Sequence, residues 1–122
     1  MVLRYASALL TLAGTLALVL GLLFWFDVAR NWLSMHMLLG FLAVGALWVI
    51  AVGQLFTSMG SWTIAISALA VGALTAVFGL YQSSFLTGAA HWVVQFVHLL
   101  LGLLTIGLGH MGAARARRGT TR

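Results

Sequence analysis

Residues 31–56, NWLSMHMLLGFLAVGALWVIAVGQLF, contain no arginine, lysine or carboxylate. They begin an 84-residue stretch, between Arg30 and Arg115, that lacks these residues throughout. As a single helix this stretch would be about 126 Å long, whereas the hydrocarbon core of a bilayer is about 30 Å thick. The chain must therefore turn back within it, and the sequence predicts several membrane-spanning segments.

The composition also indicates a membrane protein. Hydrophobic residues make up 63% of the chain, charged residues 6%, and the mean hydropathy is +1.14, whereas soluble domains carry about 25% charged residues. Asp27 is the only acidic residue, which excludes paired-carboxylate catalysis and carboxylate-bound Mg²⁺ or Ca²⁺. Without cysteine there is no disulfide, thiolate zinc site or iron–sulfur cluster. We expect no self-sufficient enzyme.

Polar and small residues mark turns at 27–31, 57–61 and 82–90. The expected fold is all-α, because lipid offers no hydrogen-bond partners to open strand edges. We predict one transmembrane domain over residues 1–122, with spans at about 5–26, 32–56, 62–85 and 91–113 and a basic tail at 114–122.

The arginines predict the orientation of these spans. Four spans put both termini on one side, which holds Arg4 and the four arginines of the last eight residues, against Arg30 and Asp27 opposite. Since positive charge stays inside, both termini are predicted to be cytoplasmic and the protein integral to the inner membrane. The clustered arginines are expected to anchor the chain to lipid, and no nucleic-acid partner is expected.

An internal repeat relates the second and fourth spans. MHMLLGFLAVG at 35–45 and VHLLLGLLTIG at 97–107 share a histidine and two glycines at a constant offset of 62 residues. The first and third spans resemble each other more weakly, around Gly21 and Gly79. We therefore predict a four-helix bundle of two duplicated two-helix halves, related by an axis along the membrane normal. His36 and His98 should face each other across that axis.

These histidines and four glycines predict a cofactor site. Gly21 and Gly79 are expected at the depth of His36 and His98. Two opposed imidazoles with glycine surfaces between them suit a flat ligand with a metal at its centre, and haem fits that description. Gly40 and Gly102, one turn after each histidine, should clear space beside it.

Gly45 and Gly107 lie nine residues after the histidines, about 180° around the helix. We expect them to face away from the site and to allow close contact between helices. For the histidine pair, an interhelical structural contact and a proton-relay or other metal role remain alternatives to haem ligation.

Three further residues are weaker candidates. Arg30 is a candidate partner for haem propionates, with interfacial anchoring as the alternative. His91 is expected at the interface, where it either bonds a propionate or faces water. His110 has Trp48 as its counterpart in the repeat, so no second histidine opposes it and no second haem is expected there.

The segments HMLLG at 36–40 and HLLLG at 98–102, on the second and fourth of four spans, resemble the haem-bearing helices of membrane b-type cytochromes, broadly the cytochrome b561 and cytochrome b groups. This resemblance implies haem b held by His36 and His98, and electron exchange with quinols or partner proteins. Typical members hold two haems with four histidines, whereas this chain offers one opposed pair.

The expected function is therefore a haem b subunit that transfers electrons within a larger respiratory or photosynthetic membrane complex. A quinone is left open as a partner. The alternative is a structural accessory subunit of a large complex, which binds a chlorophyll-type pigment or a lipid through the same histidines or only packs against its neighbours.

Overall fold

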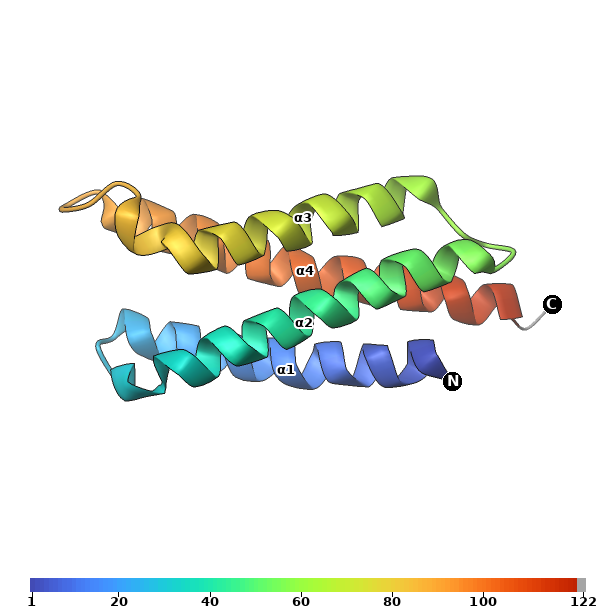
Figure 1. Ribbon diagram of the computed structural model, residues 1–122, viewed down its shortest axis with the longest axis horizontal. Helices are drawn as coiled ribbons and strands as arrows, with labels where there is room; N and C mark the ends of the chain where they lie inside the picture. Colours follow the sequence, from blue (N-terminus) through green and yellow to red (C-terminus); the bar gives the residue numbers. More distant parts are fainter. Residues whose placement is uncertain (121–122) are drawn as a thin grey trace.

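The computed structural model describes residues 1–120, which form four long helices joined by short turns (Figure 1). All four helices are long and apolar enough to cross a membrane, and no strand occurs in the described residues. The prediction of an all-helical chain with four apolar spans is confirmed. The elements are α1 (Val2–Trp25), η1 (Arg30–Trp32), α2 (Leu33–Gly53), η2 (Gln54–Phe56), α3 (Trp62–Tyr81), η3 (Gln82–Ser84) and α4 (His91–Thr120), where η denotes a 3-10 helix.

The fourth helix extends beyond the predicted span. We predicted a span that ends near residue 113 and a basic tail at 114–122, and as far as Thr120 this tail is a continuation of α4. Arginine is a good helix former, and no proline interrupts this segment, so the helix continues past the apolar stretch. The basic residues Arg115, Arg117 and Arg118 thus belong to α4, and residues 121–122 lie outside the described part of the chain.

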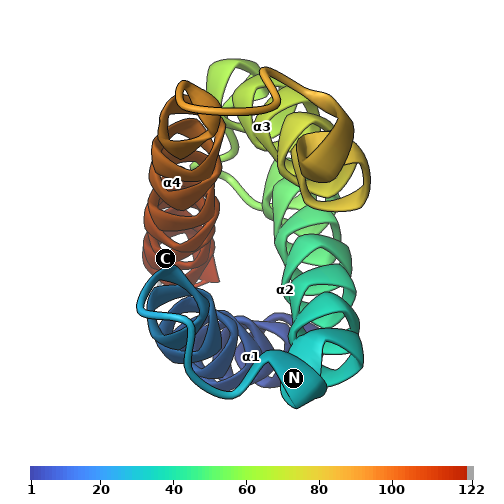
Figure 2. The same ribbon diagram turned by 90° about the vertical axis from the view of Figure 1, so that its left-hand side faces the viewer.

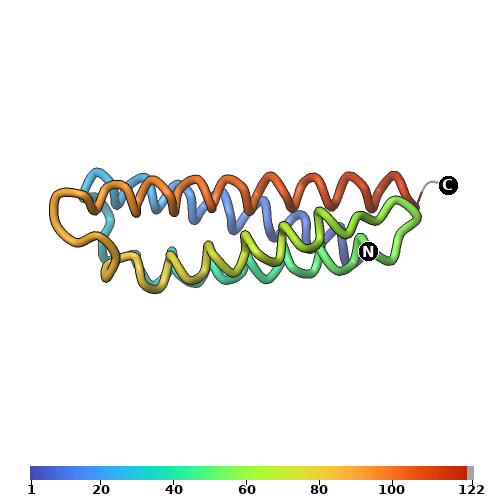
Figure 3. The backbone as a smooth tube through the Cα atoms, turned by 90° about the horizontal axis from the view of Figure 1, so that it is seen from above, coloured from blue at the N-terminus to red at the C-terminus, as the bar shows by residue number. Residues whose placement is uncertain are grey.

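The helices form an antiparallel bundle in which neighbours in sequence are also neighbours in space. Seen from one end, α1, α2, α3 and α4 follow one another around a ring (Figure 2). α2 and α4 lie diagonally opposite and also contact each other across the bundle. The start of α1 and the end of α4 lie at the same end of the bundle, together with the turn between α2 and α3 (Figure 3). This topology brings the two histidine-bearing helices together.

Buried apolar residues concentrate in the half of the bundle nearest the termini. We call this part, residues 1–17, 43–72 and 105–120, the closed half, and residues 18–42 and 73–104 the hollow half. Small and medium side chains allow the helices of the closed half to approach closely. Its buried cluster consists of Ala6, Leu10, Ala13, Ala43, Ala46, Leu47, Ile50, Ala51, Ala68 and Ala113.

The glycines that allow close packing are not the ones we expected. A Cβ at Gly45 or Gly107 would meet nothing within 4 Å, and both residues are exposed. The predicted helix contacts at these two positions are therefore wrong, because both face outward. A Cβ at Gly112 would instead lie 2.9 Å from Ile50 Cγ2, and one at Gly109 would collide with Leu10.

A buried glutamine closes the turn between α2 and α3. The Gln54 side chain is fully buried; its Nε2 donates to the Ala51 and Ser61 carbonyls at 3.2 and 2.9 Å, and its Oε1 accepts from the Ser61 amide at 2.8 Å. Ser61 Oγ in turn accepts from the Ile64 amide at the start of α3. Every hydrogen-bonding group of this side chain thus has a partner in the closed half.

Candidate functional site

His36 of α2 and His98 of α4 come together on the axis of the hollow half. Their ring centroids lie 6.2 Å apart and the ring planes are inclined by 70°. The two residues are 62 positions apart in the sequence, and the contact between the diagonally opposite helices α2 and α4 brings them together. The predicted opposition of the two imidazoles is therefore what the structure contains, whereas ligand binding by them stays a prediction.

The two imidazoles have different hydrogen-bonding environments. His36 Nδ1 lies 2.8 Å from the Ala17 carbonyl of α1, so this nitrogen donates when it carries the proton. The Phe24 ring packs edge-on against His36, with centroids 5.3 Å apart. His98 Nδ1 is buried and has no hydrogen-bond partner among the described residues. Buried polar atoms without a partner are uncommon, so the ring of His98 is incompletely satisfied by the protein alone.

A glycine faces each imidazole from the neighbouring helix. A Cβ at Gly21 of α1 would lie 3.2 Å from His36 Cε1, and a Cβ at Gly79 of α3 would lie 3.3 Å from His98 Cε1. These contacts are tighter than ordinary van der Waals spacing, so a larger residue at either position would push the ring aside. Gly21 and Gly79 therefore admit the two rings to the centre of the bundle.

A cavity of about 160 Å³ surrounds the two rings. All four helices line it. The lining includes Gly14 of α1 and Ile106 of α4, and a Cβ at Gly14 would lie 2.9 Å from Ile106 Cγ1. Gly40 and Gly102 also line it, and a Cβ at either would meet nothing within 4 Å, so both border open space. Most of the remaining lining is apolar: Ala17, Leu18, Leu22, Phe24, Trp25, Leu33, Met37, Phe41, Val44, Ala76, Leu80 and Leu99.

Three neutral polar residues in the lining were missed in the sequence. They are Thr75 of α3, Gln82 of η3 and Gln95 of α4. Thr75 Oγ1 bonds to the Val71 carbonyl at 2.7 Å and lies 3.0 Å from Thr105 Oγ1. Spacing could have identified these residues, because Gln95 lies three positions before His98, and Thr75 and Gln82 lie four before and three after Gly79.

Three of the weaker candidates lie away from the cavity. Arg30 does not line it, and its guanidinium pairs with Asp27 on the exposed turn between α1 and α2. His91 Nδ1 lies 3.3 Å from the Phe85 carbonyl, and His110 Nε2 lies 3.4 Å from the Thr11 hydroxyl. The structure thus groups His36 and His98 with Gly21, Gly40, Gly79 and Gly102, but not with Arg30.

The site offers a metal ion two nitrogen ligands from the protein. No group of three or more His, Cys, Asp or Glu side chains that could hold a metal occurs in residues 1–120. A structural zinc site needs four such ligands, so the site does not suit a bare zinc ion. A metal bound between the imidazoles would have to bring its remaining ligands with it.

Comparison with protein-family models, with curated proteins and with solved structures finds no match to this chain.

Proposed function

We propose that this protein binds one haem b in the membrane, that His36 and His98 would hold its iron, and that it serves as an electron-transfer subunit of a larger membrane complex. One observation carries the proposal: two imidazoles from diagonally opposite helices face each other at 6.2 Å inside a cavity to which all four helices contribute. Neutral imidazole is a common axial ligand of haem iron.

The spacing of the rings fits a single metal ion between them. With metal–imidazole bonds of about 2 Å and a ring nitrogen about 1 Å from the ring centre, two imidazoles on opposite sides of one metal have centroids about 6 Å apart. The observed 6.2 Å supports this arrangement. The bond from His36 Nδ1 to the Ala17 carbonyl leaves Nε2 free, and ligating histidines commonly use their second nitrogen in this way.

The size of the cavity sets a condition on binding. Its volume of about 160 Å³ is below the roughly 300–1,000 Å³ of typical small-molecule pockets. A whole macrocycle therefore requires the flexible side chains of the lining to move outward. Gly40 and Gly102 favour such a movement, because they leave open space beside the rings.

The residues of the chain would have distinct roles at this site. His36 and His98 would hold the iron, and the apolar side chains of Leu18, Phe24 and Phe41 would keep water away. A bound haem b supplies one-electron redox chemistry at the iron. The longest connection between long helices is the segment between Tyr81 and His91. A connection of this length does not form a catalytic domain, which supports a carrier of electrons rather than an enzyme.

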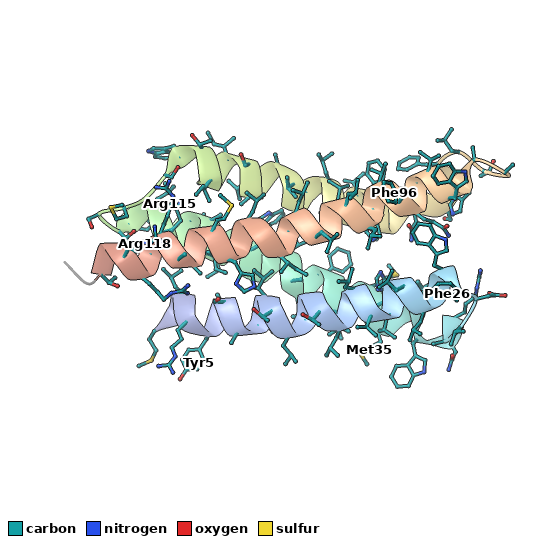
Figure 4. The ribbon with its side chains drawn as sticks, turned by 180° about the vertical axis from the view of Figure 1, so that it is seen from behind. Tyr5, Phe26, Met35, Phe96, Arg115 and Arg118 are labelled. Carbon is teal, nitrogen blue, oxygen red and sulfur yellow. The ribbon has the colours of Figure 1, made fainter. Side chains whose placement is uncertain are left out.

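The arginines support an orientation for the site. Arg4, Arg115 and Arg118 belong to the end that carries the termini, and Figure 4 shows Arg115 and Arg118 at the same end as Tyr5, opposite Phe26. If this end is cytoplasmic, the histidine pair lies towards the outer leaflet. A single haem at that depth cannot complete a path across the bilayer, so a partner protein or a quinone would have to accept or supply the electrons.

The absorption spectrum of the purified full-length chain tests this proposal. We expect reduced-minus-oxidised difference bands of a low-spin, bis-histidine haem, with one haem per chain. Red-shifted pigment bands that do not respond to reductant would instead identify a chlorophyll-type ligand. A chain that shows neither, and that binds no added haem, would overturn the proposal in favour of a structural accessory subunit.

A further inference from the structure

The two sides of the cavity carry residues at corresponding sequence offsets, but these residues differ in polarity. The offset of 62 residues that relates His36 to His98 also relates Leu33 to Gln95, and the offset of 58 that relates Gly21 to Gly79 also relates Phe24 to Gln82. All of these residues line the cavity. At corresponding places, the α1–α2 side therefore presents apolar side chains and the α3–α4 side presents amides.

The amides on the α3–α4 side have no hydrogen-bond partner in the part of the chain that the structure describes. Neither Gln82 nor Gln95 makes a side-chain hydrogen bond with the described residues 1–120. Both side chains are partly buried. Gln54 of the closed half, in contrast, is fully buried and its amide is fully paired. Each free amide offers two donors and an acceptor, and polar groups next to an apolar cavity are stabilised when a bound group pairs with them.

The unpaired histidine nitrogen lies on the same side. His98 Nδ1 is buried without a partner, whereas His36 Nδ1 on the opposite side has the Ala17 carbonyl. Gln95 lies about one helical turn from His98, towards the turn between α3 and α4. The unpaired polar groups of the cavity lining thus all belong to the α3–α4 side.

We propose that the cavity binds its ligand in one orientation, with the ligand's polar substituents against Gln82 and Gln95 and its apolar edge against Phe24 and Leu33. This inference rests on the proposed function, in which the polar substituents are the two haem propionates. It assigns these substituents to the two glutamines in place of Arg30, because the guanidinium of Arg30 is paired with Asp27 and lies outside the cavity.

Two forms of the ligand and two variants test the orientation. Purified full-length protein in lipid nanodiscs is titrated with ferric protoporphyrin IX and with its dimethyl ester, in which the propionates cannot ionise or donate. The variants are Gln95→Leu and, as a matched control at the corresponding position, Leu33→Ala. A second variant on the polar side, Gln82→Met, guards against a folding defect at Gln95.

We expect Gln95→Leu to weaken binding of ferric protoporphyrin IX about tenfold, because one or two hydrogen bonds to a charged group are lost. The affinity for the dimethyl ester should change by less than about twofold. Leu33→Ala should not discriminate between the two ligands. Suppose that each glutamine variant binds the two ligands with equal losses of affinity, or with no loss for either, while His36→Ala and His98→Ala abolish binding. The proposed orientation is then wrong, and the haem site stands. The haem site fails if the wild-type protein binds neither ligand, or if His36→Ala and His98→Ala bind both ligands as well as the wild type does. The orientation then fails with it.

Discussion

The closed and hollow halves of this bundle are built from similar helices but differ in how they fill their interior. In the closed half, Leu10, Leu47 and Ile50 are fully buried, and glycines admit neighbouring side chains. In the hollow half, glycines instead border the histidines or open space. Apart from Gly45 and Gly107, which face outward, the described glycines of the closed half serve helix packing or a turn, and those around the histidines border the cavity.

Polar side chains follow the same division. Gln54 of the closed half has partners for its amide, whereas Gln82 and Gln95 of the hollow half have none among the described residues. A satisfied polar group contributes to the fold, while an unsatisfied one next to a cavity is available to a ligand. This contrast leads us to expect that substitutions in the closed half change stability and that those in the hollow half change binding.

The largest effect is expected at the histidine pair. His36→Ala and His98→Ala should each weaken haem binding more than about 100-fold. Mutating a residue that merely supports a metal ligand already costs about 10–100-fold in affinity, and removing the ligand itself should cost more. Haem content per folded chain, from the absorption spectrum, measures the effect. His91→Ala and His110→Ala are the matched controls and should keep their haem, since neither histidine lines the cavity. Equal retention in all four variants would refute the axial assignment.

A bulky residue in the hollow half should expel the haem. Gly102 lines the cavity and borders open space, so Gly102→Leu fills that space and should reduce affinity about tenfold or more, while the protein still inserts and folds. Gly107→Leu on the same helix is the control, because Gly107 is exposed on the outer surface. Haem titration of both variants measures the difference. Comparable losses in both would mean that the side chain acts through the helix and not through the cavity.

A glycine-to-alanine substitution should change the free energy of unfolding differently in the closed half and in the hollow half. Gly109→Ala places a Cβ against the fully buried Leu10, and overpacking of this kind costs about 1–3 kcal/mol in the free energy of unfolding. Gly102→Ala meets no neighbour within 4 Å and should leave stability unchanged or raise it by up to about 1 kcal/mol, since alanine favours helix more than glycine. Unfolding of the haem-free variants in mixed micelles measures both values. A larger cost at Gly102 than at Gly109 would contradict the division into halves.

Single cysteine substitutions should disturb the protein least, and they report which half of the bundle faces the outside of the cell. Ser84→Cys lies in the hollow half, at the end of η3, and Thr120→Cys lies in the closed half, at the end of α4. Both side chains are exposed, and the chain has no cysteine of its own. Neither change should alter stability or haem binding. An impermeant thiol reagent applied to intact cells should label Ser84→Cys only. Labelling of Thr120→Cys instead would place the histidine pair near the cytoplasmic leaflet.

Patterns along the chain were enough to predict the number of helices, their approximate bounds and the pairing of His36 with His98. Long uncharged stretches and the fixed thickness of a bilayer set the spans, and a repeated histidine with its following glycine indicated a shared depth. These features depend only on positions along a helix, and they needed no knowledge of which helix lies next to which.

The face of each helix that points inward could be identified only in the assembled bundle. Lipid and protein interior are both apolar, so the spans carry little amphipathic pattern that could reveal their rotation. For this reason the outward position of Gly45 and Gly107 and the packing role of Gly109 could not be derived from spacing alone. Spacing could place Gln82 and Gln95 near the histidine site, but it could not show that their amides have no partner among the described residues. Each depends on contacts with other helices, which form only when the bundle is assembled.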